Sequence, residues 1–71
     1  MIPKFKNTKD AINFGETATP QQITELHKAR EYALNVSDIL IRKGNYKQAL
    51  DKAFTAQFYR KVIEANEIQN T

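Results

Sequence analysis

The chain has 71 residues, which is enough for one domain, residues 1–71. At this size a single hydrophobic core is barely sufficient to keep the domain folded. It contains no cysteine and one histidine, His27, which excludes a disulfide framework and an ordinary zinc site within one chain. The formal net charge of +3, from 11 basic and 8 acidic residues, is too mild to indicate nucleic acid by itself. No apolar run has the length of a signal peptide or a membrane span. We therefore expect a soluble, cytoplasmic protein without metal, other cofactor or membrane partner.

Residues 1–18 form the first segment, which we expect to be an N-terminal arm or a short helix. Asn7 or Thr8 is a suitable cap for a helix over residues 8–14 that stops at Gly15. An unstructured tail seldom carries large apolar side chains, yet this segment has four. They are Ile2, Phe5, Ile12 and Phe14. We therefore expect the segment to pack against another part of the protein.

A long helix is predicted over about residues 20–43. Thr19 is a good N-cap, Pro20 suits the first helical position, and Gln22 completes a capping box. Gly44 has the backbone freedom needed to end the helix. Between Pro20 and Gly44, apolar residues recur at steps of three and four. They are Ile23, Leu26, Ala29, Ala33, Val36 and Leu40.

A second long helix is predicted over about residues 46–68, with Asn45 as its cap. Because the two helices are nearly equal in length and the link between them is short, residues 19–68 should form a long antiparallel hairpin. The fold class expected from these elements is all-α.

The residues around the predicted turn are spaced in a way that resembles one tetratricopeptide-type hairpin, over residues 33–56. The resemblance rests on Ala33, Val36, Ser37, Leu40, Gly44, Tyr46, Ala49, Leu50 and Ala56. It implies two closely packed helices, but one repeat does not make a solenoid. The same pattern also resembles the helical hairpins of HEPN-type domains, whose ribonuclease members have an Arg followed by a His. Here His27 precedes Arg30, so that active-site motif is absent.

Candidate catalytic side chains are few. His27 and Glu31 are four residues apart beside Arg30, a pattern more typical of a solvated helix edge than of a tuned imidazole. Ser37 is more typical of close helix packing than of a nucleophile. We therefore expect no catalytic residue and no enzymatic activity. A small hydrolase or ribonuclease centred on His27 is a third interpretation of the function, after the two described below.

Nucleic-acid binding is the alternative function, because lysine and arginine side chains contact phosphate groups. Two groups of cations support it. They are Lys4, Lys6 and Lys9 in the arm, and Arg42, Lys43 and Lys47 at the turn. The cations at the turn are also explained by the dipole of the first long helix, so this remains the alternative.

The second long helix has more apolar surface than one partner helix can cover. Large apolar side chains recur at steps of four beside a row of alanines. They are Leu50, Phe54, Phe58 and Val62, and the alanines are Ala49, Ala53 and Ala56. On the first long helix, Leu34 and Ile41 also lie away from the contact between the two helices. Either residues 1–18 fold back over this surface, or a second chain completes a four-helix bundle. We favour a homodimer. The alternative protein partner is another helical protein. The expected partner-binding residues are Tyr32, Phe54, Phe58, Tyr59 and Val62.

Overall fold

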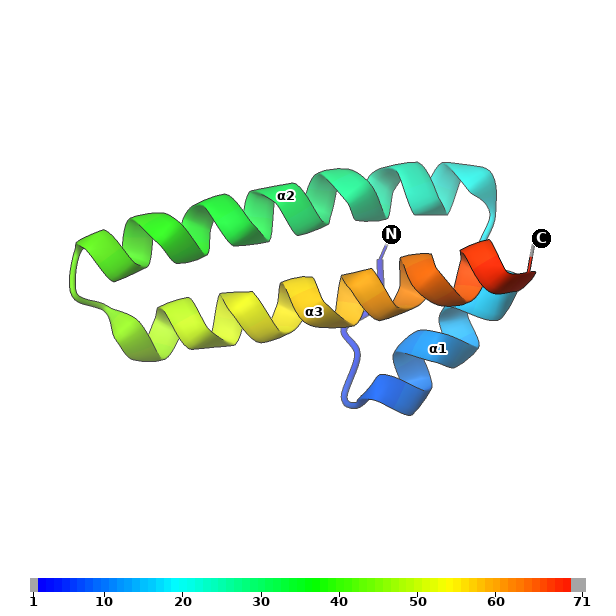
Figure 1. Ribbon diagram of the computed structural model, residues 1–71, viewed down its shortest axis with the longest axis horizontal. Helices are drawn as coiled ribbons and strands as arrows, with labels where there is room; N and C mark the ends of the chain where they lie inside the picture. The colour runs from blue at the N-terminus through cyan, green and yellow to red at the C-terminus, as the bar shows by residue number, and fades with distance from the viewer. Residues whose placement is uncertain (1, 70–71) are drawn as a thin grey trace.

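The computed structural model describes residues 2–69 and is all-helical in that range (Figure 1). An arm without regular secondary structure, residues 2–6, leads into α1 (Thr8–Thr17), α2 (Pro20–Arg42) and α3 (Tyr46–Gln69). The all-α class expected from the sequence is confirmed. The molecule is elongated, with extents of 41 × 21 × 20 Å.

Local signals in the sequence account for the bounds of α2. The Thr19 hydroxyl accepts from the amide of Gln22 (3.2 Å), and the Gln22 side chain accepts from the amide of Thr19 (2.8 Å), which is the predicted capping box. Gly44 adopts a left-handed φ of 81° just after the helix. Asn45 then precedes α3, and its carbonyl accepts from the amide of Ala49 (3.0 Å).

The first helix differs from the prediction at its C-terminal end. Asn7 caps it by accepting from the amide of Asp10 (2.9 Å), but α1 continues through Gly15 to Thr17. Gly15 was predicted to stop the helix, whereas it is a buried helical residue packed against α3. At its end, the amide of Ala18 donates to the carbonyl oxygen of Gly15 (3.4 Å), and Asn66 of α3 donates to the carbonyl oxygens of Gly15 (3.0 Å) and Ala18 (3.1 Å).

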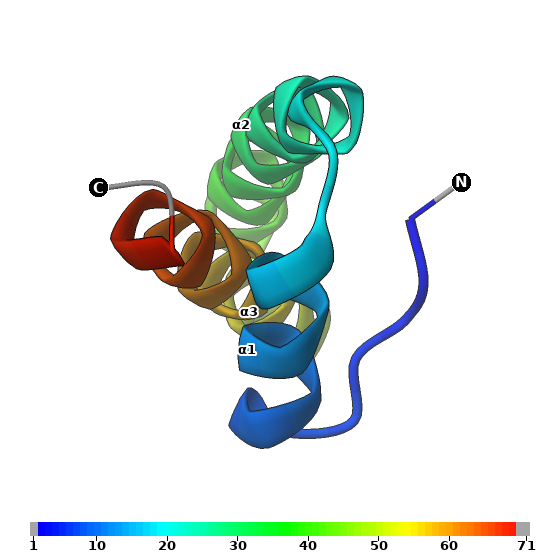
Figure 2. The same cartoon turned by 90° about the vertical axis from the view of Figure 1, so that its right-hand side faces the viewer.

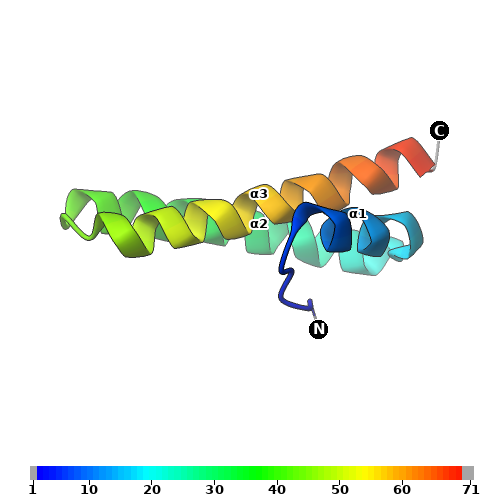
Figure 3. The same ribbon diagram turned by 90° about the horizontal axis from the view of Figure 1, so that it is seen from below.

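The three helices lie with α3 in the middle, in contact with α2 on one side and α1 on another (Figure 2). α2 and α3 run antiparallel along the whole length of the molecule, whereas the short α1 lies along only the C-terminal part of α3 (Figure 3). We call residues 32–54, at the end of the α2–α3 pair that carries the turn, the distal half. It extends beyond α1, so α1 does not cover the two helices there.

The hydrophobic core lies in the other half of the molecule, where all three helices and the arm meet. Large side chains from the arm, α2 and α3 are buried together there with one alanine of α1. The buried residues are Phe5, Ala11, Leu26, Val62 and Ile63. Ile2, Phe14, Ile23, Phe58 and Tyr59 pack around them and are partly buried.

In contrast, the distal half is held together through small side chains. Ala33, Ser37 and Ala49 are buried there between α2 and α3, and Ala56, just beyond the distal half, continues the row. The Ser37 hydroxyl donates to the carbonyl oxygen of Ala49 (2.9 Å), which satisfies a buried polar group between the helices. Because small residues let the helix backbones approach, the larger apolar side chains of this half lie outside the seam.

Candidate functional site

Exposed apolar side chains gather in the distal half. Of the nine large hydrophobic residues that are exposed within residues 2–69, seven lie between residues 32 and 54. They are Tyr32, Leu34, Ile39, Ile41, Tyr46, Leu50 and Phe54. Contiguous apolar surface is a feature of interaction sites, whereas scattered single residues need no explanation.

Helical spacing places four of these residues on one side of the α2–α3 pair. Leu34 and Ile41 are seven residues apart and share a side of α2, and Tyr46 and Leu50 are four apart on α3. The two rows face the same way, because Leu34 lines one shallow depression together with residues 53 and 57, which continue the row of α3. We call Leu34, Ile41, Tyr46, Leu50 and Ala53 the distal apolar face.

The same side of the pair becomes charged toward the other end of the molecule. His27 and Arg30 of α2 line a second depression with Arg60, Glu64 and Glu67 of α3. The Arg60 guanidinium and the Glu64 carboxylate form an exposed ion pair at 2.9 Å. The distal apolar face therefore has a polar boundary, and His27 lies among charged side chains at that boundary.

The structure separates the five residues that the sequence suggested for partner binding. Phe54 is half exposed, and Tyr32 is exposed on the edge of α2 opposite Leu34. Phe58 and Tyr59 are partly buried where the arm packs against them. Val62 is 0% exposed, so its place in a partner-binding surface was wrong.

Val62 is buried because the arm and α1 fold back on α3. The Phe5 ring lies edge-on to Phe14 at 5.5 Å and to Tyr59 at 6.2 Å, so these three rings close over the C-terminal half of α3. α1 then covers Val62, whose carbonyl oxygen lies directly against Gly15. The sequence did not reveal how far the arm and α1 extend along α3. For that reason Leu34 and Ile41 were not among the predicted partner-binding residues.

The two predicted groups of cations lie apart. Lys4 is in the arm, and Lys6 and Lys9 surround the start of α1, near the middle of the long axis, whereas the turn is at one end (Figure 1). At the turn, Arg42 is paired with Asp38 at 3.0 Å on the surface of α2. The geometry therefore does not join the arm and the turn into one phosphate-binding surface.

No group of three or more His, Cys, Asp or Glu side chains suited to a metal ion is present in the described part of the chain. None of the three helices, over the residues described, is long and apolar enough to cross a membrane.

No protein-family model matches the chain, and no curated protein or solved structure is significantly similar to it.

Proposed function

We propose that the protein is a non-enzymatic helical interaction module that self-associates through the distal apolar face. The observation that carries this proposal is the exposure of Leu50, Ile41 and their neighbours on the half of the molecule that α1 does not cover. An uncovered pair of helices buries one stripe on each helix, and a second copy is the simplest source of the missing layer.

The size of the face suits a dimer. At about 200 Å² for a fully exposed large side chain, the exposed parts of Leu34, Ile41, Tyr46 and Leu50 amount to roughly 400 Å². A standard interface buries about 800 Å² on each partner, of which a little more than half is apolar. The distal apolar face therefore supplies nearly all the apolar area that such an interface needs.

Two opposing terms decide the association. Burial of the distal apolar face favours it, whereas the loss of translational and rotational freedom and the ordering of side chains oppose it.

Two α2–α3 pairs facing each other across a two-fold axis would form a four-helix bundle. Only the distal halves would overlap, because the charged boundary of Arg30, Arg60 and Glu64 is costly to bury without partners. The proposed dimer is therefore longer than one chain, with the two cores at opposite ends.

Sedimentation equilibrium at micromolar concentrations tests the proposal directly. We expect the wild-type chain to sediment as a dimer and Leu50→Glu, which places a carboxylate on the face, to sediment as a folded monomer. A wild-type chain that remains monomeric up to about 100 µM would refute self-association and would leave another helical protein as the occupant of this face.

A further inference from the structure

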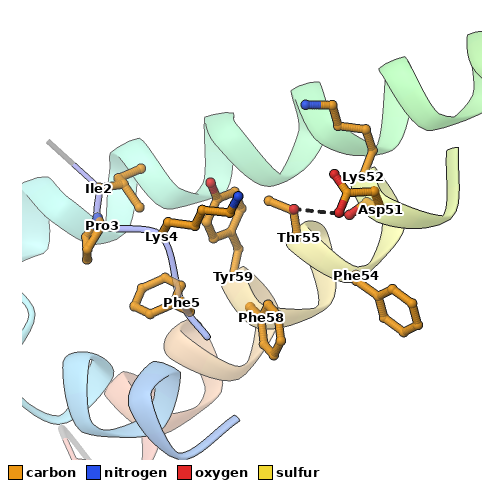
Figure 4. Close-up of a pocket in the computed structure, with 10 residues that line it drawn as sticks. All are labelled: Ile2, Pro3, Lys4, Phe5, Asp51, Lys52, Phe54, Thr55, Phe58 and Tyr59. Atoms are coloured by element: carbon orange, nitrogen blue, oxygen red, sulfur yellow. Dashed lines mark hydrogen bonds between the residues drawn. The ribbon is translucent and has the colours of Figure 1, made fainter. Parts of the chain in front are cut away.

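A groove lies between the arm and α3 (Figure 4). Its volume is about 380 Å³, within the range of sites that hold small ligands or a few peptide residues. Lys52, on its wall, follows Leu50 by two residues, which places their side chains on opposite sides of α3. The Lys52 side of the groove therefore stays open when a second copy covers Leu50, whereas Phe54, four residues after Leu50, lies closer to that copy.

Aromatic side chains line the α3 wall of the groove. Phe58 and Tyr59 are partly buried against the arm, and Phe54, 51% exposed, lies at the far end (Figure 4). Phe5 closes the opposite end, where it packs against Tyr59. This wall offers an apolar surface with room for one large side chain of a ligand.

Two ammonium groups from different elements border these rings. Lys4 comes from the arm and Lys52 from α3. Within the described residues, the ion pairs are Asp38 with Arg42 and Glu64 with Arg60, so neither lysine is neutralised by one. Asp51 is the one carboxylate among the lining residues. The groove is thus positive, and its mixed lining disfavours a ligand that carries phosphates alone.

The arm forms the second wall of the groove. Among the described residues, no hydrogen bond joins residues 2–6 to the helices, and the arm is anchored by the Phe5 ring and by Ile2. Its backbone amide and carbonyl groups are therefore open to a ligand that lies alongside in an extended conformation.

We propose that this groove binds a short acidic segment of a partner protein, with a large apolar or aromatic side chain between its carboxylates. The carboxylates pair with Lys4 and Lys52, and the apolar side chain packs on Phe58 and Tyr59. Charge complementarity selects this occupant, because the lysines flank an apolar wall and not a continuous basic track.

The test uses the full chain labelled with ¹⁵N and the peptide acetyl-Glu-Glu-Leu-Phe-Glu-Glu-amide as the probe. We expect amide shifts at Lys4, Lys52 and Thr55 in the wild-type protein. The double variant Lys4→Gln, Lys52→Gln should bind about five- to tenfold more weakly, as the loss of two partly exposed ion pairs predicts. The matched control, Lys28→Gln with Lys43→Gln, makes the same charge change away from the groove and should bind like the wild type.

Three results would overturn the proposal. One is equal weakening by the two double variants, which would indicate attraction by net charge only. Another is equal binding of the charge-reversed peptide acetyl-Lys-Lys-Leu-Phe-Lys-Lys-amide. The third is tighter binding of hexathymidylate at the same amides, which would make the groove a nucleic-acid site. None of these three results depends on self-association, which is measured separately by sedimentation equilibrium of the same variants.

Discussion

Gly15 is the residue at which α1 and α3 leave no room for a side chain. A Cβ at this position would lie 2.3 Å from the carbonyl oxygen of Val62 and 2.9 Å from the Cβ of Ala65. Backbone atoms cannot move aside as the end of a flexible side chain can, so the helices must separate. This requirement outweighs the higher helix propensity of alanine, about 1 kcal/mol.

We predict that Gly15→Ala lowers the free energy of unfolding by about 1 to 3 kcal/mol, the usual cost of overpacking. Urea denaturation followed by circular dichroism measures it. Asn13→Ala, at an exposed position of the same helix, is the control and should leave the free energy unchanged or slightly higher. An equally stable Gly15→Ala would show that α1 does not pack on α3 at this distance.

Ser37 serves the α2–α3 seam in two ways, by its small size and by its hydrogen bond to Ala49. We predict a loss of about 1 kcal/mol of unfolding free energy for Ser37→Ala, which removes the hydrogen bond alone. Ser37→Val removes the bond and also adds volume between closely packed helices, so it should cost about 1 to 3 kcal/mol more. Equal stability of the two variants in thermal denaturation would contradict close packing at this residue.

At the scale of elements, α1 depends on a cap supplied by another helix. Asn66 donates to two carbonyl oxygens at the C-terminal end of α1, where the last carbonyl groups of a helix lack the usual partner four residues on. Asn66→Ala should lower the free energy of unfolding by about 1 to 2 kcal/mol.

The effect of Asn66→Ala should also be local. Hydrogen exchange should speed up in α1 more than in α2, because the lost bonds hold only α1. Lys47→Ala, an exposed change on α3, is the control. Uniform acceleration across all three helices would contradict a capping role for Asn66.

The long helices were predictable because their ends are determined by neighbouring residues. Thr19 and Gln22 cap each other, and Gly44 needs only its own left-handed φ. The end of α1 was not predictable in the same way. Gly15 has no local sign that distinguishes a helix terminator from a contact residue, and the residue that caps α1, Asn66, is about fifty positions away.

The same limit applies to the candidate site. The apolar surplus of α3 was visible as a repeat of large side chains, but the sequence does not show how far a folded-back segment reaches along it. Val62 lies under α1 and Leu50 lies beyond its end, although both belong to the same row of residues. Which of them faces a partner depends on the length of α1, a tertiary property.

At the scale of the whole molecule, the small core makes stability sensitive to association. If the distal apolar face binds a second copy, folding and dimerisation are linked, and the midpoint of thermal unfolding must depend on concentration. For a domain of this size we predict a rise of about 3 to 6 °C for each tenfold increase in protein concentration. Differential scanning calorimetry at several concentrations measures this; a midpoint that does not change would contradict linkage.

Self-association through one particular face is tested most directly by two substitutions on α2. Ile39 and Ile41 have almost the same exposure, 49% and 48%, and are two residues apart, but only Ile41 belongs to the distal apolar face. Glutamate at either position adds the same charge to the same helix. In sedimentation equilibrium at micromolar concentration we predict a dimer for the wild type and for Ile39→Glu, and a folded monomer for Ile41→Glu. Equal masses for the two variants, or a dimer that survives in Ile41→Glu, would contradict the proposed interface.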